Sequence, residues 1–240
     1  MRFIFISLLL VGCSGAWVPP DDFVRRDILA GDYEIATYQK ITDKTAPVHI
    51  YIEGDGHAFD AHGNATGDPT PRGTLVRDLA TRDIGANVVY MARPCQFIMS
   101  PVCDETDWTD GRFSARVVDS VATAIHKIAG KRPVILVGYS GGGLLSGIII
   151  NRHPEIQVKR WVTIAGVPNH AAWTEYFGDV PLTKSLDLDR LPNVPAIHYI
   201  GARDRVVPPE LSRKFLPINQ VVEIPGAGHD DFERINIDFT

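Results

Sequence analysis

One short stretch, from Val134 to Leu145, limits most strongly what this chain can fold into. An apolar run leads into a Gly-Tyr-Ser-Gly-Gly sequence centred on Ser140, and a second apolar run, compatible with a helix, follows directly. This order predicts a strand, a sharp turn and a helix, because small neighbours allow a serine at the tip of such a turn to adopt a strained backbone. The hydroxyl of Ser140 would lie near the positive end of the helix dipole, where a developing oxyanion is stabilised. The stretch therefore fits a nucleophile; the alternative is a simple glycine-rich turn.

Apolar segments alternate with amphipathic ones along most of the chain. Strands are expected at residues 31–41, 48–52, 87–92, 134–139, 160–165, 196–200 and 221–224. Helices are expected at residues 73–82, 113–129, 209–215 and from the turn after Ser140 to about residue 153. The segments 93–111 and 166–192 lack clear periodicity and are expected to be loops, too short for a large lid. This alternation predicts an α/β fold, with a doubly wound, mostly parallel sheet and helices on both faces.

Four chemically useful positions follow predicted strand ends: Gly54, Ser140, Asp204 and His229. In doubly wound sheets the functional site lies outside the carboxyl ends of the strands, so these residues are expected to meet there. A serine needs a base to take its proton, and a histidine base needs an acid to orient it. Ser140, Asp204 and His229 are therefore the candidate catalytic residues.

Other acids and histidines could in principle fill the same roles. Asp179, Asp187 and Asp189 could supply the acid, but they lie in the irregular segment 166–192 and not directly after a strand. The remaining histidines are weaker candidates for the base because most fall within predicted strands or helices.

Three segments carry a family resemblance: the turn around Ser140, residues 201–208 with Asp204, and residues 226–229 ending in His229. Together, in the order serine, acid, histidine, they resemble the α/β-hydrolase superfamily from about residue 48 to residue 232. The resemblance implies a serine hydrolase that cleaves a carboxylic ester of a small acyl substrate through an acyl-enzyme, without a cofactor. Alternatives on the same fold are a peptidase, a thioesterase, an acyltransferase, or a catalytically silent binding lipoprotein of the cell envelope.

The resemblance also implies an oxyanion hole made of two backbone N–H groups. One candidate is Gly141, directly after Ser140. The other comes from residues 53–56, where Glu53 and Asp55 depart from the glycine-rich pattern of the superfamily. Asp55 is the expected donor, with Gly54 as the alternative.

The first residues read as an export signal. Arg2 precedes an apolar run that is too short to span a bilayer, and the run ends at Leu-Val-Gly-Cys, which resembles the lipobox of bacterial lipoproteins. The resemblance implies a signal over residues 1–12, lipidation of Cys13 and a lipid anchor on the periplasmic side of the outer membrane. The rest of the sequence is expected to form a tether over 13–22 and one domain over 23–240. The alternative is ordinary cleavage and a secreted or soluble periplasmic protein.

Cysteine usage agrees with export. With Cys13 lipidated, Cys95 and Cys103 remain, close in sequence and in an oxidising compartment, so a disulfide between them is expected. No metal site is expected, because no histidine is interleaved with these cysteines and His57, Asp60 and His62 lie in a turn-rich loop with no common register.

Size and charge restrict the remaining classes. With 240 residues, 45% of them hydrophobic, the chain can bury one substantial core. The formal net charge is -5 and basic residues are not clustered, which argues against nucleic-acid binding.

Overall fold

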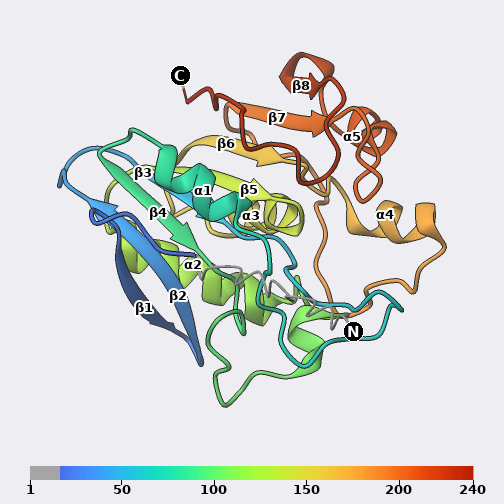
Figure 1. The fold of residues 1–240 in the computed structure, drawn as a ribbon, viewed down its shortest axis with the longest axis horizontal. Coiled ribbons are helices and arrows are strands. Elements are labelled where there is room, and N and C mark those ends of the chain that lie inside the picture. The colour runs from blue at the N-terminus through green and yellow to red at the C-terminus, as the bar shows by residue number, and fades with distance from the viewer. Residues whose placement is uncertain (1–16, 240) are drawn as a thin grey trace, which may run out of the picture.

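The structure, a computed structural model, describes residues 17–239 as one eight-stranded sheet with helices around it (Figure 1). The strand order is β1-β2-β4-β3-β5-β6-β7-β8. Neighbours from β4 to β8 run parallel, whereas β2 pairs antiparallel with both β1 and β4. The strands are β1 (Val24–Ala30), β2 (Tyr33–Ile41), β3 (Val48–Ile52), β4 (Asn87–Met91), β5 (Val134–Tyr139), β6 (Val158–Ile164), β7 (Ala196–Gly201) and β8 (Val221–Ile224).

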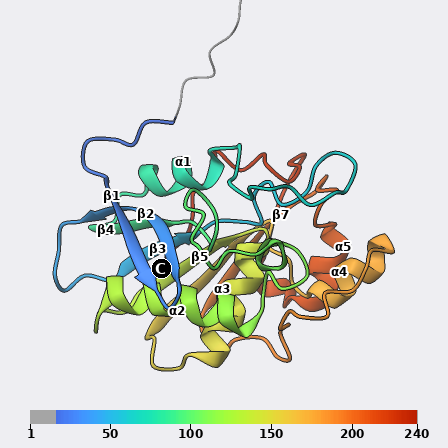
Figure 2. The ribbon, with the colours of Figure 1, turned by 90° about the horizontal axis from the view of Figure 1, so that it is seen from below.

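Helices cover both faces of this sheet. Figure 2 shows α1 on one side and α2 and α3 on the other. The α-helices are α1 (Leu75–Arg82), α2 (Ala115–Ala129), α3 (Gly141–Arg152), α4 (His170–Phe177) and α5 (Pro209–Phe215). Two short 3-10 helices, η1 (Glu105–Trp108) and η2 (Ile218–Gln220), lie in connections. The predicted α/β fold with a mostly parallel, doubly wound sheet and little lid is confirmed.

The core is divided in two by the sheet, as the alternation of side chains along each strand requires. Ile50 and Ile52 of β3 belong to the cluster under α2 and α3, and Tyr51 between them belongs to the cluster under α1. The C-terminal residues continue this second layer, with Phe232 fully buried in it. Both faces of the central strands β3, β4 and β5 are therefore buried, which explains their nearly continuous apolar sequences.

Two elements differ from the sequence-based expectation. Strand β1 was not expected, because its residues are mostly exposed at the sheet edge and show no alternating pattern; backbone pairing with β2 holds it in place. Helix α4 forms within the segment 166–192, where a loop was predicted. The side chain of Asn169 accepts a hydrogen bond from Ala172 N at 2.7 Å, and Gly178 ends the helix in the left-handed conformation at φ 69°. Capping residues, and not a strong apolar stripe, define this short helix.

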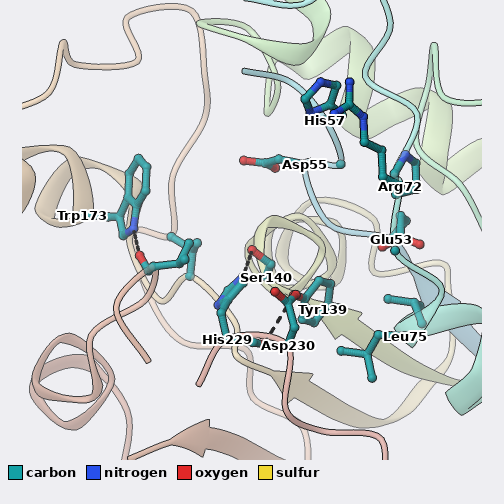
Figure 3. Close-up of a pocket in the computed structure, with 16 residues that line it drawn as sticks. Glu53, Asp55, His57, Arg72, Leu75, Tyr139, Ser140, Trp173, His229 and Asp230 are labelled. Atoms are coloured by element: carbon teal, nitrogen blue, oxygen red, sulfur yellow. Dashed lines mark hydrogen bonds between the residues drawn. The ribbon is translucent and has the colours of Figure 1, made fainter. Parts of the chain in front are cut away.

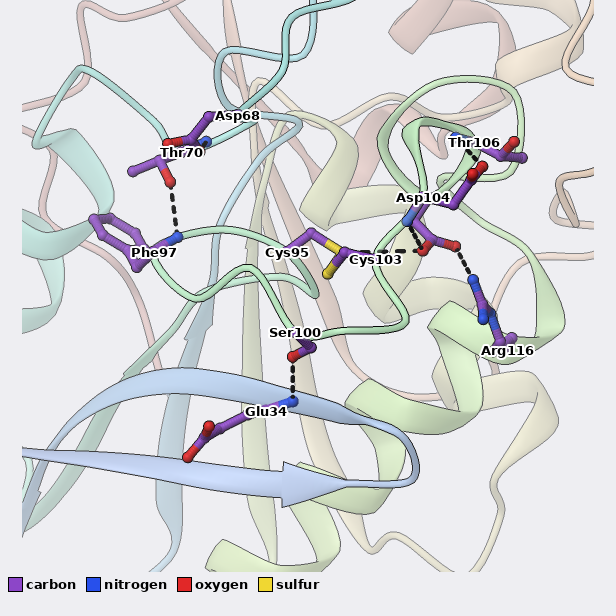
Figure 4. The surroundings of a disulfide bond; sticks show 11 residues. Glu34, Asp68, Thr70, Cys95, Phe97, Ser100, Cys103, Asp104, Thr106 and Arg116 are labelled. Carbon is purple, nitrogen blue, oxygen red and sulfur yellow. Dashed lines mark hydrogen bonds and ion pairs between the residues drawn. A yellow bond between two sulfur atoms is a disulfide. The ribbon is translucent and has the colours of Figure 1, made fainter.

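The predicted disulfide between Cys95 and Cys103 is present, and it closes the loop after β4 (Figure 4). The same loop is tied to its surroundings by hydrogen bonds to its backbone and side chains. Phe97 N donates to Thr70 Oγ1 at 2.7 Å, and Ser100 Oγ accepts from Glu34 N of β2 at 2.9 Å. The loop is thus fixed at several points without regular secondary structure.

The order of strands fixes where the site can form. After β3 the chain adds β4 on one side, and after β5 it adds β6, β7 and β8 on the other. The direction of winding therefore reverses between β3 and β5, and loops leaving their carboxyl ends diverge there to open a crevice. The loop after β3 contains Gly54 and Asp55, and Ser140 follows β5.

Candidate active site

Ser140 occupies the turn between β5 and α3 with φ 51°, in the left-handed region that a residue with a side chain rarely adopts. Glycines around it permit a very close approach of the backbone. A Cβ on Gly138 would lie 2.3 Å from Gly142 O, and a Cβ on Gly142 would lie 2.5 Å from Ile52 O. Only glycine fits at these two positions, so the sequence pattern encodes the strained turn.

Three residues distant in sequence converge beside this turn (Figure 3). The Nε2 atom of His229 lies 3.0 Å from Ser140 Oγ, and its Nδ1 atom lies 2.8 Å from Asp204 Oδ2. Asp204 comes from the loop after β7 and His229 from the loop after β8. The structure brings together the three residues that the sequence singled out, in a continuous chain of hydrogen bonds.

The carboxylate of Asp204 is held by its own loop. Its Oδ1 atom accepts from the N–H groups of Val206 and Val207, each at 2.8 Å, and the residue is 4% exposed. Asp187, one of the alternatives, instead accepts from backbone N–H groups at the start of α4. Among Asp179, Asp187, Asp189 and Asp204, only Asp204 contacts His229.

The loop of His229 is fixed by the residue before the serine. Tyr139 donates its hydroxyl hydrogen to Asp230 Oδ1, and its ring lies 5.2 Å from the imidazole of His229 between centroids. This contact links the turn after β5 directly to the loop after β8. It was not foreseen, although the position beside Ser140 marked Tyr139 as a neighbour of the site.

The loop after β3 forms the facing wall. A Cβ on Gly54 would lie 3.2 Å from the Cβ of Ser140, so this loop passes close to the serine. The N–H of Gly54 donates to Glu53 Oε1 at 3.0 Å, and Tyr90 donates its hydroxyl hydrogen to Glu53 Oε2 at 2.9 Å. Gly54 N–H is thus turned toward the buried Glu53. Within residues 17–239, Asp55 N–H and Gly141 N–H have no acceptor.

Glu53 is buried among these groups, and burial raises its pKa to about 7 despite the two hydrogen bonds that oppose the change. A raised pKa means that Glu53 loses its proton less readily than an exposed glutamate does, so burial disfavours a negative charge beside the site.

Asp55 keeps its charge by pairing. Burial would raise the pKa of Asp55, but Arg112 and Arg93 outweigh burial and hold it below its usual value. Arg93 Nη1 contacts Asp55 Oδ1, and Arg112 Nη1 lies 3.1 Å from Oδ2. The carboxylate lies against Gly141, where a Cβ would be 2.0 Å from Oδ1. One carboxylate between two guanidinium groups leaves a net positive charge at the start of α3.

Arg93, Arg112 and Gln96 were missed as site residues by sequence reasoning. Gln96 Nε2 donates to Gly54 O at 2.9 Å and its Oε1 accepts from Arg93 N at 3.0 Å, so the disulfide loop holds the loop after β3. A signal existed for Arg93, which lies directly beyond the carboxyl end of β4. No comparable signal marks Arg112, which lies outside any strand end.

A cleft of about 370 Å³ opens above Ser140. Its walls are formed by Tyr139, Val167, Trp173, Val206, His229 and Asp230, together with side chains of the segments 53–57 and 71–76. Figure 3 shows Ser140 between Trp173 and the pair His57 and Arg72. A volume of this size suits a small organic molecule.

The candidate metal ligands do not converge. His57 lines the cleft, whereas the side chain of His62 is 85% exposed and Asp60 accepts hydrogen bonds from His62 N and Asn64 N in a local turn. Among residues 17–239 no three His, Cys, Asp or Glu side chains form a group that could hold a metal ion.

The predicted signal and lipidation site, with Cys13, lie outside the described residues. The tether predicted for 13–22 is described only from Trp17, whose indole N–H donates to Asp78 Oδ1 at 2.9 Å. No helix within the described part of the chain is long and apolar enough to cross a membrane.

Comparison with known proteins connects this site to a family. The family model described as serine hydrolase (FSH1) matches residues 105–225, about half of the chain, a range that contains Ser140 and Asp204 and ends just before His229. No curated protein sequence matches this chain.

Solved structures share the fold at low sequence identity. An α/β serine hydrolase without a lid from Xanthomonas campestris has a TM-score of 0.56 and 14% identity, covering 89% of this chain and 88% of its own. Est1E from Butyrivibrio proteoclasticus has a TM-score of 0.57 and 17% identity, covering 86% and 91%. An α/β serine hydrolase homologue from Coxiella burnetii has a TM-score of 0.56 and 18% identity, covering 91% and 94%.

Proposed function

The chain belongs to the serine hydrolase (FSH1) family, and from this premise we propose that it hydrolyses a carboxylic ester with Ser140 as the nucleophile. The observation that carries the proposal is the hydrogen-bonded series Ser140–His229–Asp204, at 3.0 and 2.8 Å. Both distances are within the range expected for a nucleophile, its base and the group that orients the base.

The proposed reaction has two halves. Ser140 Oγ attacks the carbonyl carbon while His229 Nε2 takes its proton; the tetrahedral intermediate then breaks its bond to the alcohol oxygen, which receives the proton from His229. A water molecule next attacks the carbonyl carbon of the acyl-enzyme and gives a proton to His229 Nε2. The second tetrahedral intermediate then breaks its C–O bond to Ser140, His229 returns the proton to Ser140 Oγ, and the acid is released. Asp204 holds Nδ1–H throughout and stabilises the imidazolium that forms in each half.

We propose Gly141 N–H and Asp55 N–H as the oxyanion hole. Gly141 N–H belongs to the first turn of α3, where helical N–H groups lack an intrahelical acceptor. Gly54 N–H is the weaker candidate because Glu53 already accepts from it. The net positive charge of Asp55 with Arg93 and Arg112 would further favour a developing oxyanion.

We propose an ester as the substrate bond, and the shape of the cleft supports the hydrolysis of a small substrate. The cleft has exposed residues along its edge, Gly56 and Arg72, so water can reach an acyl-enzyme and complete hydrolysis. Its volume of about 370 Å³ favours a small acyl substrate over an extended polymer. A peptidase would show a higher kcat/KM with amides than with esters, and a thioesterase would show a higher kcat/KM with thioesters. An acyltransferase would turn over faster when an alcohol acceptor is present.

Labelling with a fluorophosphonate tests the nucleophile. The purified full-length protein is treated with the probe, and mass spectrometry locates the adduct. We expect label on Ser140 in the native chain and none in Ser140→Ala. Absence of label on Ser140 in protein that unfolds cooperatively would overturn the proposal.

We further propose that the protein is exported and anchored through a lipid on Cys13 at the periplasmic side of the outer membrane. The disulfide between Cys95 and Cys103 supports an oxidising compartment. Mass spectrometry of protein recovered from membranes tests the anchor: a lipid mass on an N-terminal Cys13 is expected, and an unmodified Cys13 would contradict it.

A further inference from the structure

Arginines gather around the loop after β3, although the chain as a whole has a formal net charge of -5. Arg93 and Arg112 share the single carboxylate of Asp55. Arg77, 7% exposed, lies near Glu53, where its charge lowers the pKa of that carboxyl group against the larger effect of burial. The arginines around this loop are Arg72, Arg77, Arg93 and Arg112, and the carboxylates are Glu53 and Asp55. Of these groups, Arg72, Glu53 and Asp55 line the cleft, whereas Arg77, Arg93 and Arg112 are buried and offset the charge of the two carboxylates.

The position of Arg72 in the cleft is built into the backbone. Gly56 has φ 66°, and a Cβ there would lie 2.1 Å from Pro69 O and 3.2 Å from Pro71 N. His57 N donates to Pro69 O at 3.0 Å, which joins the same two segments. Only glycine permits this approach, and it brings the segment of Arg72 against the loop that faces Ser140.

A buried arginine supports the same segment from behind. Arg77 Nη2 donates to Gly73 O at 2.8 Å, directly after Arg72. The guanidinium of Arg77 also lies between aromatic rings, 4.9 Å from the centroid of Trp17 and 5.3 Å from that of Phe97. The backbone that carries Arg72 is therefore fixed while its side chain stays exposed.

Arg72 differs from the other charged groups of the cleft because it has no partner among the described residues. Glu53 accepts from Tyr90, Asp55 pairs with two arginines, and Asp230 accepts from Tyr139. Within residues 17–239, no hydrogen bond or ion pair involves the guanidinium of Arg72. It is the one lysine, arginine, aspartate or glutamate lining the cleft of which this is true.

The opposite wall is apolar and fixed. Trp173 donates its indole hydrogen to Val206 O at 2.6 Å, and both residues line the cleft. Figure 3 places Trp173 across Ser140 from Arg72 and His57. A substrate whose reacting carbonyl sits at Ser140 thus meets a free cation on one side and an apolar surface on the other.

We propose that the substrate is a small ester that carries a carboxylate, which Arg72 binds while the apolar part of the molecule contacts Trp173. This proposal rests on the hydrolase function and adds the class of substrate. A guanidinium offers two parallel N–H donors to a carboxylate, which gives orientation as well as affinity. Substrates would then be selected by the distance between their carboxylate and their ester group, because the carboxylate must reach Arg72 while the ester carbonyl lies at Ser140.

Matched ester pairs test the proposal and show on which side of the ester the carboxylate lies. For the acyl side, the 4-nitrophenyl monoester of adipate is compared with 4-nitrophenyl hexanoate. For the alcohol side, 4-acetoxybenzoate is compared with its methyl ester. The readout is the ratio of kcat/KM for the anionic ester to kcat/KM for the neutral one, in the native full-length chain and in Arg72→Gln and Arg72→Lys.

In at least one pair we expect Arg72→Gln to lower this ratio by about tenfold, because a charge-assisted hydrogen bond to the carboxylate is lost. Arg72→Lys should lower the ratio less, because lysine keeps the positive charge. Added salt should lower the ratio in the native chain and have less effect in Arg72→Gln. Arg234→Gln is the control, because Arg234 is exposed and lines a separate cavity beside the end of α1. Arg234→Gln removes the same charge and should leave kcat/KM unchanged for both the anionic and the neutral ester.

Equal losses with anionic and neutral esters, or a ratio that Arg72→Gln does not change in either pair, would overturn the proposal. The hydrolase function is tested separately by fluorophosphonate labelling of Ser140 in the native chain. Labelled protein with an unchanged ratio rejects only the anionic substrate, whereas unlabelled protein rejects the hydrolase function itself.

Discussion

The two walls of the cleft are constructed in different ways. The serine side depends on short-range backbone geometry: a left-handed Ser140, glycines that cannot be replaced, and an Asp204 held by the N–H groups two and three residues later. The facing loop depends on side chains far along the chain, since Asp55 contacts Arg93 and Arg112. The loops of Ser140 and Asp204 therefore take their shape mainly from their own backbone, although they meet His229 only in the folded domain. The shape of the facing loop depends on ion pairs with distant residues.

This difference predicts different responses to mutation. Changes on the serine side should remove activity with little effect on stability, because the turn persists without the reacting groups. Changes behind the facing loop should lower both activity and stability. The buried charges there hold the loop in shape, and a buried charge that loses its partner destabilises the fold.

Among the variants that compare the two walls, the largest effect should come from Asp204→Asn. The amide can still accept from the N–H groups of Val206 and Val207 but no longer stabilises an imidazolium, so kcat should fall about 10⁴-fold. The free energy of unfolding should change by less than about 1 kcal/mol. Steady-state kinetics and urea denaturation measure the two quantities.

Asp187→Asn is the matched control for Asp204→Asn, since Asp187 also accepts from backbone N–H groups but does not contact His229. It should leave kcat unchanged. A kcat for Asp204→Asn within tenfold of the native value would argue that Asp204 does not orient the base.

A smaller loss of activity, with a large loss of stability, is expected for Arg93→Met. Removing one partner of a buried charge cluster typically destabilises by about 3 to 5 kcal/mol. The displaced loop after β3 should lower kcat by about 100-fold, the effect of losing one oxyanion donor. Denaturation and kinetics are compared with Arg152→Met, which breaks an exposed pair with Asp119 and should change stability by less than about 1 kcal/mol. Full stability of Arg93→Met would contradict the idea that this wall depends on its ion pairs.

Removing the disulfide should weaken the same wall from further away. The double variant Cys95→Ala and Cys103→Ala should lose about 2.5 kcal/mol of unfolding free energy, the value expected for so short a loop. Activity should fall only a few-fold, because Gln96 can still reach Gly54 O. Dithiothreitol should lower the unfolding free energy and the activity of the native chain by the same amounts, and it should have no effect on the double variant. An effect on the double variant would show that the reductant does not act through the disulfide between Cys95 and Cys103.

The smallest effect on turnover is expected from Glu53→Gln, which instead changes the pH dependence of stability. The pKa of Glu53 is about 7 in the folded chain, against an ordinary value of 4.5. Between these pH values the folded chain binds a proton that the unfolded chain releases, so the free energy of unfolding falls as pH rises, by on the order of 3 kcal/mol in all. Denaturation at several pH values should show this slope in the native chain and a flatter one in Glu53→Gln. Equal slopes would indicate that Glu53 is ionised in the folded chain well below pH 7.

The contrast between the walls also explains what could be predicted from sequence. The glycines around Ser140 and the strand ends before Asp204 and His229 are contiguous signals, so the convergence of these residues could be anticipated. The strands of the parallel sheet were found because both faces are buried and their sequences are apolar. The pairing of Asp55 with Arg93 and Arg112 leaves no periodic trace, because it depends on how two irregular loops pack. Strand β1 and helix α4 were missed for a related reason, since edge pairing and caps define them in place of an apolar pattern.

The most direct test of the central claim, that Ser140 and His229 act as one catalytic unit, is a kinetic double-mutant cycle. We measure kcat with 4-nitrophenyl hexanoate for Ser140→Ala, His229→Ala and the double variant, each shown to be folded. If the two residues act together, each single variant should lose about 10⁶-fold and the double variant should be no slower than either. Losses that multiply in the double variant, or substantial turnover by Ser140→Ala, would contradict the account.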